Sequence, residues 1–317
     1  MTIDALLSRG DGTDERLDLA SWTPKRLRAD ELLWVDVVET DADDLRIVAG
    51  ALGLKQSALD SLKSDAVCPS ARVLEHAVEI CVLSLSAADE EPAPMRIVVG
   101  PEWIITQHAS SIEMLDERRE RITDQREVGL LSPVEFLVTM LSWHVDSFFR
   151  TAEQLEREVD DLDDAALRGD EELIRRLVAM RRRIARYRRV AGLHREVFAD
   201  LARPDFLPEL DERESRAIVD VTERLERAYE ALSNVREMLI GTFDVHMTRT
   251  AQRTNDIVRV LTWASVILLP AVVIAGIMGM NFKVGFFDNP SFFFVVVGLM
   301  VSLAVVTLVV ARWRRWL

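Results

Sequence analysis

A stripe of small and polar residues follows one face of an apolar segment near the C-terminus. At alternating steps of three and four, it contains Asn255, Val258, Thr262, Ser265, Leu269, Val272, Gly276 and Gly279. Hydroxyl and amide groups at this spacing would let water or a hydrated cation pass along a membrane helix. The same stripe also suits close contact between two helices, the commoner use of small residues in membranes. Asn281, just beyond it, would in isolation be a helix C-cap.

The stripe belongs to the first of two segments that are long enough to cross a membrane. Residues 260–282 and 291–311 contain no Asp, Glu, Lys or Arg, and roughly 20 apolar residues span a hydrocarbon core. Three arginines precede the first segment and three follow the second, whereas the connecting loop carries only Lys283. The positive-inside rule therefore predicts cytoplasmic termini, an external loop and a cytoplasmic domain of roughly 255 residues.

The rest of the chain is acidic, with a net charge of −14 over 317 residues. Its start has no basic-then-apolar pattern, so no signal peptide is expected. Cys68 and Cys81 are too few for a disulfide framework, and we expect them to be small apolar residues in a reducing compartment. We expect residues 1–130 to form a cytoplasmic α/β layer domain, because strand-like apolar runs alternate with helical patterns. The strand-like runs are 32–38, 78–85, 96–100 and 103–106, and the helical patterns are 42–54 and 56–64.

Long helices dominate residues 131–255, which we interpret as a cytoplasmic stalk. Ser132, Pro133 and Glu135 mark a helix start, and an apolar stripe runs from Leu137 to Leu162. A second helix covers 171–201, and a third begins near 210 with no strong break before Pro270. The acidic run at 153–164 and the basic run at 181–189 favour antiparallel helices joined by salt bridges. Residues 256–317 form the predicted transmembrane hairpin.

The motif Gly279-Met280-Asn281 at the outer end of the first of two C-terminal spans resembles the signature of the CorA family of divalent metal ion (magnesium) transporters. Similar features are Asn255 before the span, Pro270 within it, the basic tail at 312–317 and the strand at 102–108. The resemblance implies passive Mg²⁺ transport through a homopentamer in the inner membrane, gated by intracellular Mg²⁺ and lined by the first span of each subunit.

The resemblance also implies roles for individual residues. Gly279, Met280 and Asn281 would form the selectivity filter, where a ring of amide oxygens could bind the water shell of Mg²⁺ without removing it. The pore-lining residues would be Asn255, Val258, Leu261, Thr262, Ser265, Leu269, Val272 and Gly276. Among these, Val258, Leu261 and Leu269 are the candidate hydrophobic constrictions. Asp220 aligns with a carboxylate that binds regulatory Mg²⁺ between subunits.

Two alternatives remain open at this stage. Lys283 in the outer loop departs from the acidic loops of the family, although Asp288 offsets its charge, and the zinc-transporting ZntB branch shares the Gly-Met-Asn motif. Zn²⁺, Co²⁺ or Ni²⁺ could therefore be the ion, although the sequence has no His/Cys cluster typical of a zinc site. A membrane-anchored divalent-ion sensor that does not conduct is the second alternative. No phosphate loop, nucleophile elbow or nucleic-acid motif is present, so we expect neither an enzyme nor a nucleic-acid partner.

Overall fold

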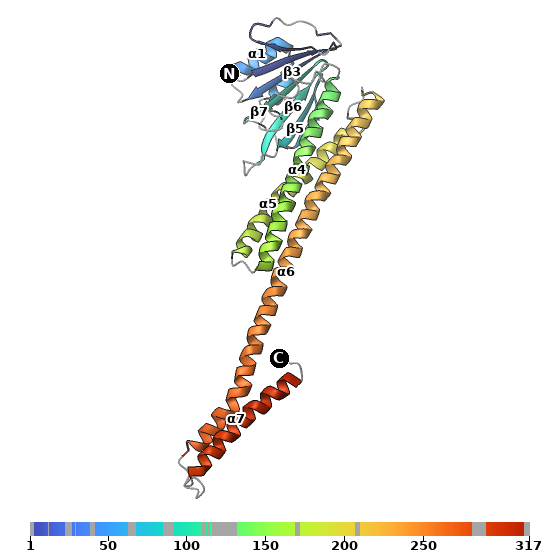
Figure 1. Ribbon diagram of the computed structural model, residues 1–317. Coiled ribbons are helices and arrows are strands. Elements are labelled where there is room, and N and C mark those ends of the chain that lie inside the picture. The colour runs from blue at the N-terminus through green and yellow to red at the C-terminus, as the bar shows by residue number, and fades with distance from the viewer. Residues whose placement is uncertain are drawn as a thin grey trace. The chain divides into compact units, whose positions relative to one another are not determined.

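A computed structural model describes residues 3–11, 13–22, 27–28, 30–38, 42–62, 68–84, 92–109, 112, 115, 132–168, 172–206, 210–280 and 290–313. The chain divides into two compact units, Met1–Phe243 and Asp244–Leu317. One helix, α6 (Glu212–Met278), belongs to both units (Figure 1).

The first unit is built on a seven-stranded sheet in the order β2-β1-β3-β7-β6-β5-β4. Its strands are β1 (Ile3–Arg9), β2 (Asp14–Leu17), β3 (Glu31–Val38), β4 (Ser70–Val73), β5 (Val78–Ser84), β6 (Ala93–Val99) and β7 (Trp103–His108). β3 and β7 pair in parallel, and the other neighbours pair antiparallel. The sequence predicted β3, β5, β6 and β7. It missed β1, β2 and β4, of which β2 and β4 are four-residue edge strands.

Helices cover both faces of this sheet, which confirms the predicted α/β layer fold. Because side chains alternate along a strand, Leu32 and Trp34 of β3 join the core under the long helices, whereas Leu33 and Val35 join the opposite core. The opposite core contains residues of α1 (Ala42–Leu52) and α2 (Gln56–Leu62). α4 (Pro133–Arg168), α5 (Leu173–Leu201) and the first part of α6 contribute to the first core.

The helices α4 and α6 each bury an apolar face, and the buried face of α4 is the one predicted from the sequence. Every member of the α4 stripe between Leu137 and Leu162 is buried, and α6 buries a matching stripe from Ile218 to Leu239. Arg183 of α5 forms a bidentate ion pair with Glu158 of α4, in agreement with the predicted antiparallel, charge-paired arrangement. α6 continues past Pro270 to Met278, so this proline does not end the helix.

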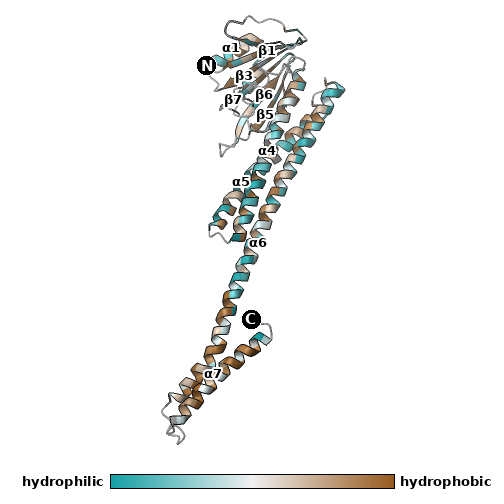
Figure 2. Ribbon diagram, viewed as in Figure 1, coloured by the Kyte–Doolittle hydropathy of each residue, from teal (hydrophilic) through white to brown (hydrophobic). Residues whose placement is uncertain are grey.

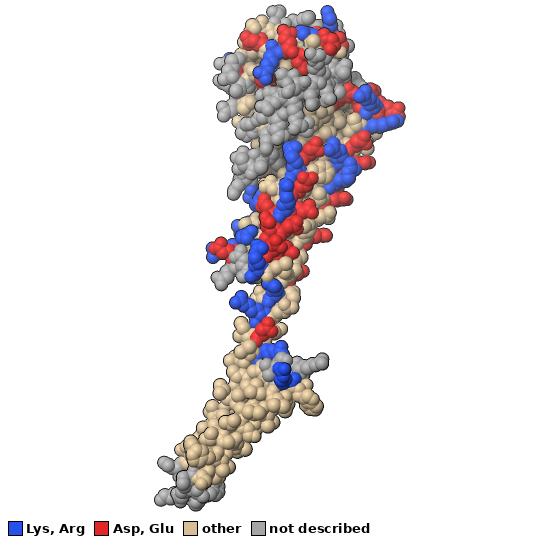
Figure 3. Space-filling view, in the orientation of Figure 1, with Lys and Arg blue, Asp and Glu red and all other residues tan. Residues whose placement is uncertain are grey.

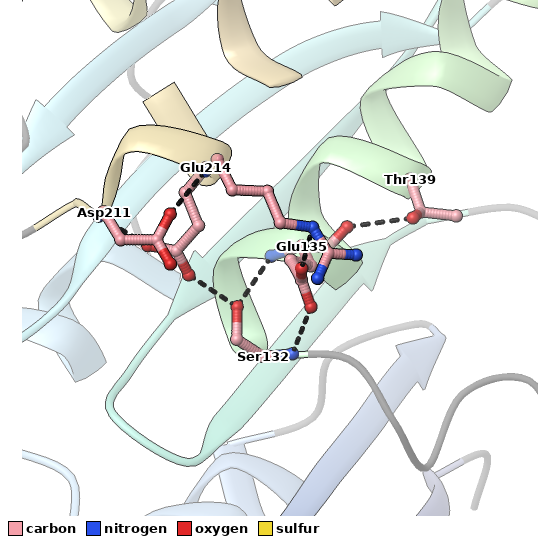
Figure 4. A network of polar contacts seen from close by, with 6 residues as sticks. Ser132, Glu135, Thr139, Asp211 and Glu214 are labelled. Atoms are coloured by element: carbon pink, nitrogen blue, oxygen red, sulfur yellow. Dashed lines mark hydrogen bonds and ion pairs between the residues drawn. The ribbon is translucent and has the colours of Figure 1, made fainter. Parts of the chain in front are cut away.

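A shared capping network joins the starts of α4 and α6 (Figure 4). Ser132 Oγ accepts a hydrogen bond from the Glu135 N–H at 3.1 Å, and Glu135 Oε2 accepts one from the Ser132 N–H at 3.0 Å. Asp211 and Glu214 form the same reciprocal capping box on α6. Ser132 Oγ donates to Glu214 Oε1 at 2.6 Å, and Arg213 Nε lies 3.2 Å from Glu135 Oε1. The two helix N-termini are therefore held together.

The cysteines differ from the sequence expectation. Cys68 and Cys81 form a disulfide, with their Cα atoms 5.4 Å apart, within the usual range for such bonds. The physical reason is strand pairing: β4 runs antiparallel to β5 with Ser70 opposite Cys81, which brings Cys68, two residues before β4, beside Cys81. The expectation of two unpaired apolar side chains is therefore wrong.

Two histidines meet in the core between α4 and α5. The His144 and His194 rings lie 4.7 Å apart between centroids, and neither side chain is exposed. His194 Nε2 accepts a hydrogen bond from the Leu83 N–H of β5 at 2.9 Å, and its Nδ1 donates to the Val190 carbonyl oxygen at 2.7 Å. Burial lowers the pKa of His194 to about 4. Burial, and then repulsion from His194, lowers the pKa of His144 well below its ordinary value.

We predict that the free energy of unfolding decreases as the pH falls from about 6.5 towards 4. In this window the unfolded chain protonates both imidazoles while the folded chain keeps them neutral, at a cost of roughly 3 kcal/mol for His194 alone. Denaturant unfolding at several pH values measures this slope. His144→Phe should flatten it, whereas the exposed His76→Asn should not; identical slopes for the wild type and His144→Phe would contradict the assignment.

Candidate functional site

Among the residues that the structure describes, two helices are long and apolar enough to cross a membrane. They are the C-terminal part of α6 and α7 (Pro290–Trp313), and no residue in their most apolar stretches is fully buried. Figure 2 shows both as continuous hydrophobic ribbons, in contrast to the mixed colouring of α4 and α5. The two apolar segments predicted from the sequence are therefore helices.

The stripe predicted from the sequence lies on an open face of α6. Its members Val258, Leu269 and Val272 expose 54–66% of their surface, and the other members, Asn255, Thr262, Ser265, Gly276 and Gly279, are also exposed. Leu261, which lies outside the stripe but is also predicted to line the pore, is 65% exposed. A different face of the same segment is half-buried, and it contains Trp263, Ile267, Pro270, Ala271, Ile274 and Met278. The residues 281–289 that join α6 to α7 are few, so α7 starts close to the end of α6. The small and polar stripe is thus distinct from the partly covered face.

The two hydroxyl groups in the stripe are held in place by the helix itself. Thr262 Oγ1 donates to the Val258 carbonyl oxygen at 2.7 Å, and Ser265 Oγ donates to the Leu261 carbonyl oxygen at 2.9 Å. Each hydroxyl oxygen keeps lone pairs for an approaching water. The two hydroxyl groups therefore present acceptors without a fixed charge, a chemistry that suits a hydrated cation.

The helix ends at the start of the Gly-Met-Asn motif. The Gly279 N–H bonds to the Ala275 carbonyl oxygen at 2.9 Å, and the Met280 N–H bonds to that of Ile277 at 3.2 Å, a tighter turn than the preceding helix. Gly279 and Met280 are exposed. Asn281, Lys283 and Asp288 lie outside the described residues.

Asp220 lies on the first turns of α6, in the other unit. Its side chain is exposed, and it lines a shallow groove of about 600 Å³ with Asp211, Glu212, Arg213 and Arg216. Within the described ranges, no three His, Cys, Asp or Glu side chains are grouped so that they could hold a metal ion. Asp211 and Glu212 thus share the groove with Asp220, but the described residues of one chain form no three-ligand metal site there.

The open stripe generates a test of water access. With cysteine placed singly at Ser265 or Val272, a charged, membrane-impermeant thiol reagent should react at least about tenfold faster than at Ile267 or Ile274, which lie on the half-buried face. The native cysteines are bonded to each other and add little background. The labelling rate of each variant is measured in liposomes, with mass spectrometry to quantify the modified protein over time. Equal rates at all four positions would remove the stripe as a water path.

Solved structures with the same fold include a magnesium transporter. The complete structure of the CorA magnesium transporter from Methanocaldococcus jannaschii superposes with a TM-score of 0.84 at 22% identity and covers all of both chains. Among curated proteins, the cobalt/magnesium transport protein CorA of the same organism is 23% identical and covers both chains fully. The protein of that description from Thermotoga maritima is 24% identical over 90% of this chain and 83% of its own.

The family comparison covers nearly the whole chain. The family described as CorA-like Mg²⁺ transporter protein matches residues 29–313, which include strands β3 to β7 of the sheet, the long helices and both apolar helices. The chain therefore belongs to the CorA-like Mg²⁺ transporter family.

Proposed function

We propose that this protein is a homopentameric channel that lets Mg²⁺ cross the inner membrane passively. The observation that carries the proposal is the open stripe of small and polar residues on the apolar part of α6. Two helices per chain cannot enclose a water path in lipid, so conduction requires several copies. In the proposed ring, each copy contributes one α6 to the pore, and its termini face the cytoplasm because arginines flank the apolar segments.

The filter in this proposal is the ring of Gly279, Met280 and Asn281 at the outer mouth. Mg²⁺ gives up its water reluctantly and demands near-octahedral geometry. Neutral amide oxygens can bind its hydration water, whereas a ring of carboxylates would hold the ion too tightly for rapid release. Lys283 opposes cation entry from the same loop, and Asp288 offsets this charge.

Below the filter, three apolar side chains are proposed to close the pore. Val258, Leu261 and Leu269 expose 54%, 65% and 65% of their surface on α6. Rings of such side chains in a narrow helix bundle exclude water, and a pore without water blocks an ion that travels with its hydration shell.

The filter proposal is tested by flux into proteoliposomes that contain a Mg²⁺-sensitive dye and no nucleotide. Asn281→Ala should reduce Mg²⁺ uptake by about tenfold or more, equivalent to about 1.4 kcal/mol. Asn234→Ala, an exposed position in the helical layer, is the matched control and should conduct normally. Uptake of Zn²⁺ but not Mg²⁺ would instead favour a ZntB-type transporter, and absence of any flux would favour a non-conducting sensor.

For regulation, we propose that Asp220 binds intracellular Mg²⁺ together with a carboxylate of the neighbouring subunit. Its exposed position and its place on the helix that lines the pore support this role. Bound Mg²⁺ would stabilise the closed ring and leave as the internal concentration falls.

We predict that Asp220→Asn raises the internal Mg²⁺ concentration needed for half-inhibition of flux about tenfold, the equivalent of about 1.4 kcal/mol. Asp244→Asn makes the same charge change at another exposed position of α6 and should leave inhibition unchanged. Equal inhibition curves for the wild type and Asp220→Asn would exclude Asp220 as a sensor residue.

A further inference from the structure

A groove of about 660 Å³ lies between α5 and α6 within the first unit. Buried Leu177, Ile184 and Leu239 form part of its apolar lining, and Ile240 and Phe243 contribute side chains that are 45% and 44% exposed. A contiguous apolar groove on a polar surface commonly marks an interaction site.

Four arginines also line this groove. They are Arg181, Arg188, Arg189 and Arg236. Among the residues that the structure describes, none of the four has a carboxylate within ion-pair distance. In contrast, Arg183 and Arg195 of α5 pair with Glu158 and Glu226. Arg188 donates instead to the Tyr229 hydroxyl at 3.2 Å. The groove therefore presents uncompensated positive charge in a chain whose net charge is −14.

A complementary stripe lies on α4 of the same unit. Glu153, Glu156, Asp160 and Asp164 recur at helical spacing, are exposed, and have no basic partner within the described ranges. Leu167, 48% exposed, continues the stripe by one turn. Figure 3 shows that the surface of the helical part carries many carboxylates, with basic side chains among them. The stripe offers negative charge followed by an apolar side chain, the converse of the groove.

The stripe and the groove also lie at the same level along the helices. The Arg183–Glu158 pair aligns the acidic part of α4 with the middle of α5, and the Arg195–Glu226 pair aligns α5 with the start of the groove on α6. Rotation about an axis that runs along the helices leaves this level unchanged. In a ring of copies, the stripe of one chain can therefore face the groove of the next, a head-to-tail contact that closes on itself.

We propose that the α5–α6 groove binds the acidic stripe of α4 from a neighbouring copy of this chain. This interface rests on the homo-oligomer in the proposed function but not on ion conduction. The arginines pair with the carboxylates of the neighbour, and Leu167 packs against the apolar end of the groove. Because each contact joins the groove of one chain to the stripe of the next, all subunits follow one another in the same rotational direction around the ring.

Zero-length cross-linking tests the contact directly in the full-length protein. Arg189→Lys keeps the charge and adds an amine that a carbodiimide couples to a touching carboxylate. Mixed isotope-labelled and unlabelled chains should then give peptides that join Lys at this position to residues 153–164 of another chain. Arg182→Lys, an exposed neighbour outside the groove, should give none. Absence of the inter-chain link, or equal yield in the control, would overturn the proposal and favour another occupant such as an anionic lipid.

Charge reversal provides a second, independent measurement. Arg181→Glu with Arg189→Glu should raise the concentration for half-dissociation of the oligomer about tenfold or more, as should Asp160→Arg with Asp164→Arg. All four changes together should restore assembly, because each contact again joins opposite charges. If the combined variant instead assembles more weakly than either double variant, the proposed interface would be wrong. Because the readout is assembly, a ring that forms but does not conduct would reject the proposed function and leave this interface intact.

Discussion

A backbone that crosses a lipid bilayer must satisfy all its hydrogen bonds internally, and this constraint limits how the chain can form a path for ions. Within the described part of the chain, two helices meet this requirement, α6 and α7. Two helices leave no enclosed path for water. A pore is therefore a property of an assembly, and the polar stripe of α6 acquires a function only where copies of it face one another.

The first unit holds the beginning of α6 firmly. The linked capping boxes of Ser132 and Asp211 tie its N-terminus to that of α4, and its apolar stripe packs into the core beneath the sheet. His194 in turn bonds α5 to the backbone of β5. α6 is a single helix from Glu212 to Met278, so the segment anchored in the first unit and the apolar segment in the second unit belong to one helix.

Periodicity and capping chemistry were informative about the long elements. The Ser132 start, the buried stripe of α4 and the two apolar helices all follow from local pattern, because each depends on residues three or four positions apart. Asp211 and Glu214 carry the same capping signal at the start of α6. The sequence predicted this start only approximately, near residue 210, and the helix begins at Glu212. The short strands β2 and β4 and the Cys68–Cys81 bond depend on pairing with distant segments, which local pattern does not encode. The stripe lies on an exposed face of α6, but its role in a pore and the role of Asn281 stay predictions, because one chain shows neither the neighbouring copies nor an ion.

The measurement that tests the central claim most directly is the mass of the assembled protein by native mass spectrometry from detergent or nanodiscs. We expect the mass of a closed homo-oligomer that contains five copies of the 36.0 kDa chain. A protein that remains monomeric or dimeric under conditions where it is folded would contradict the account, because four apolar helices or fewer do not surround a path for a hydrated ion.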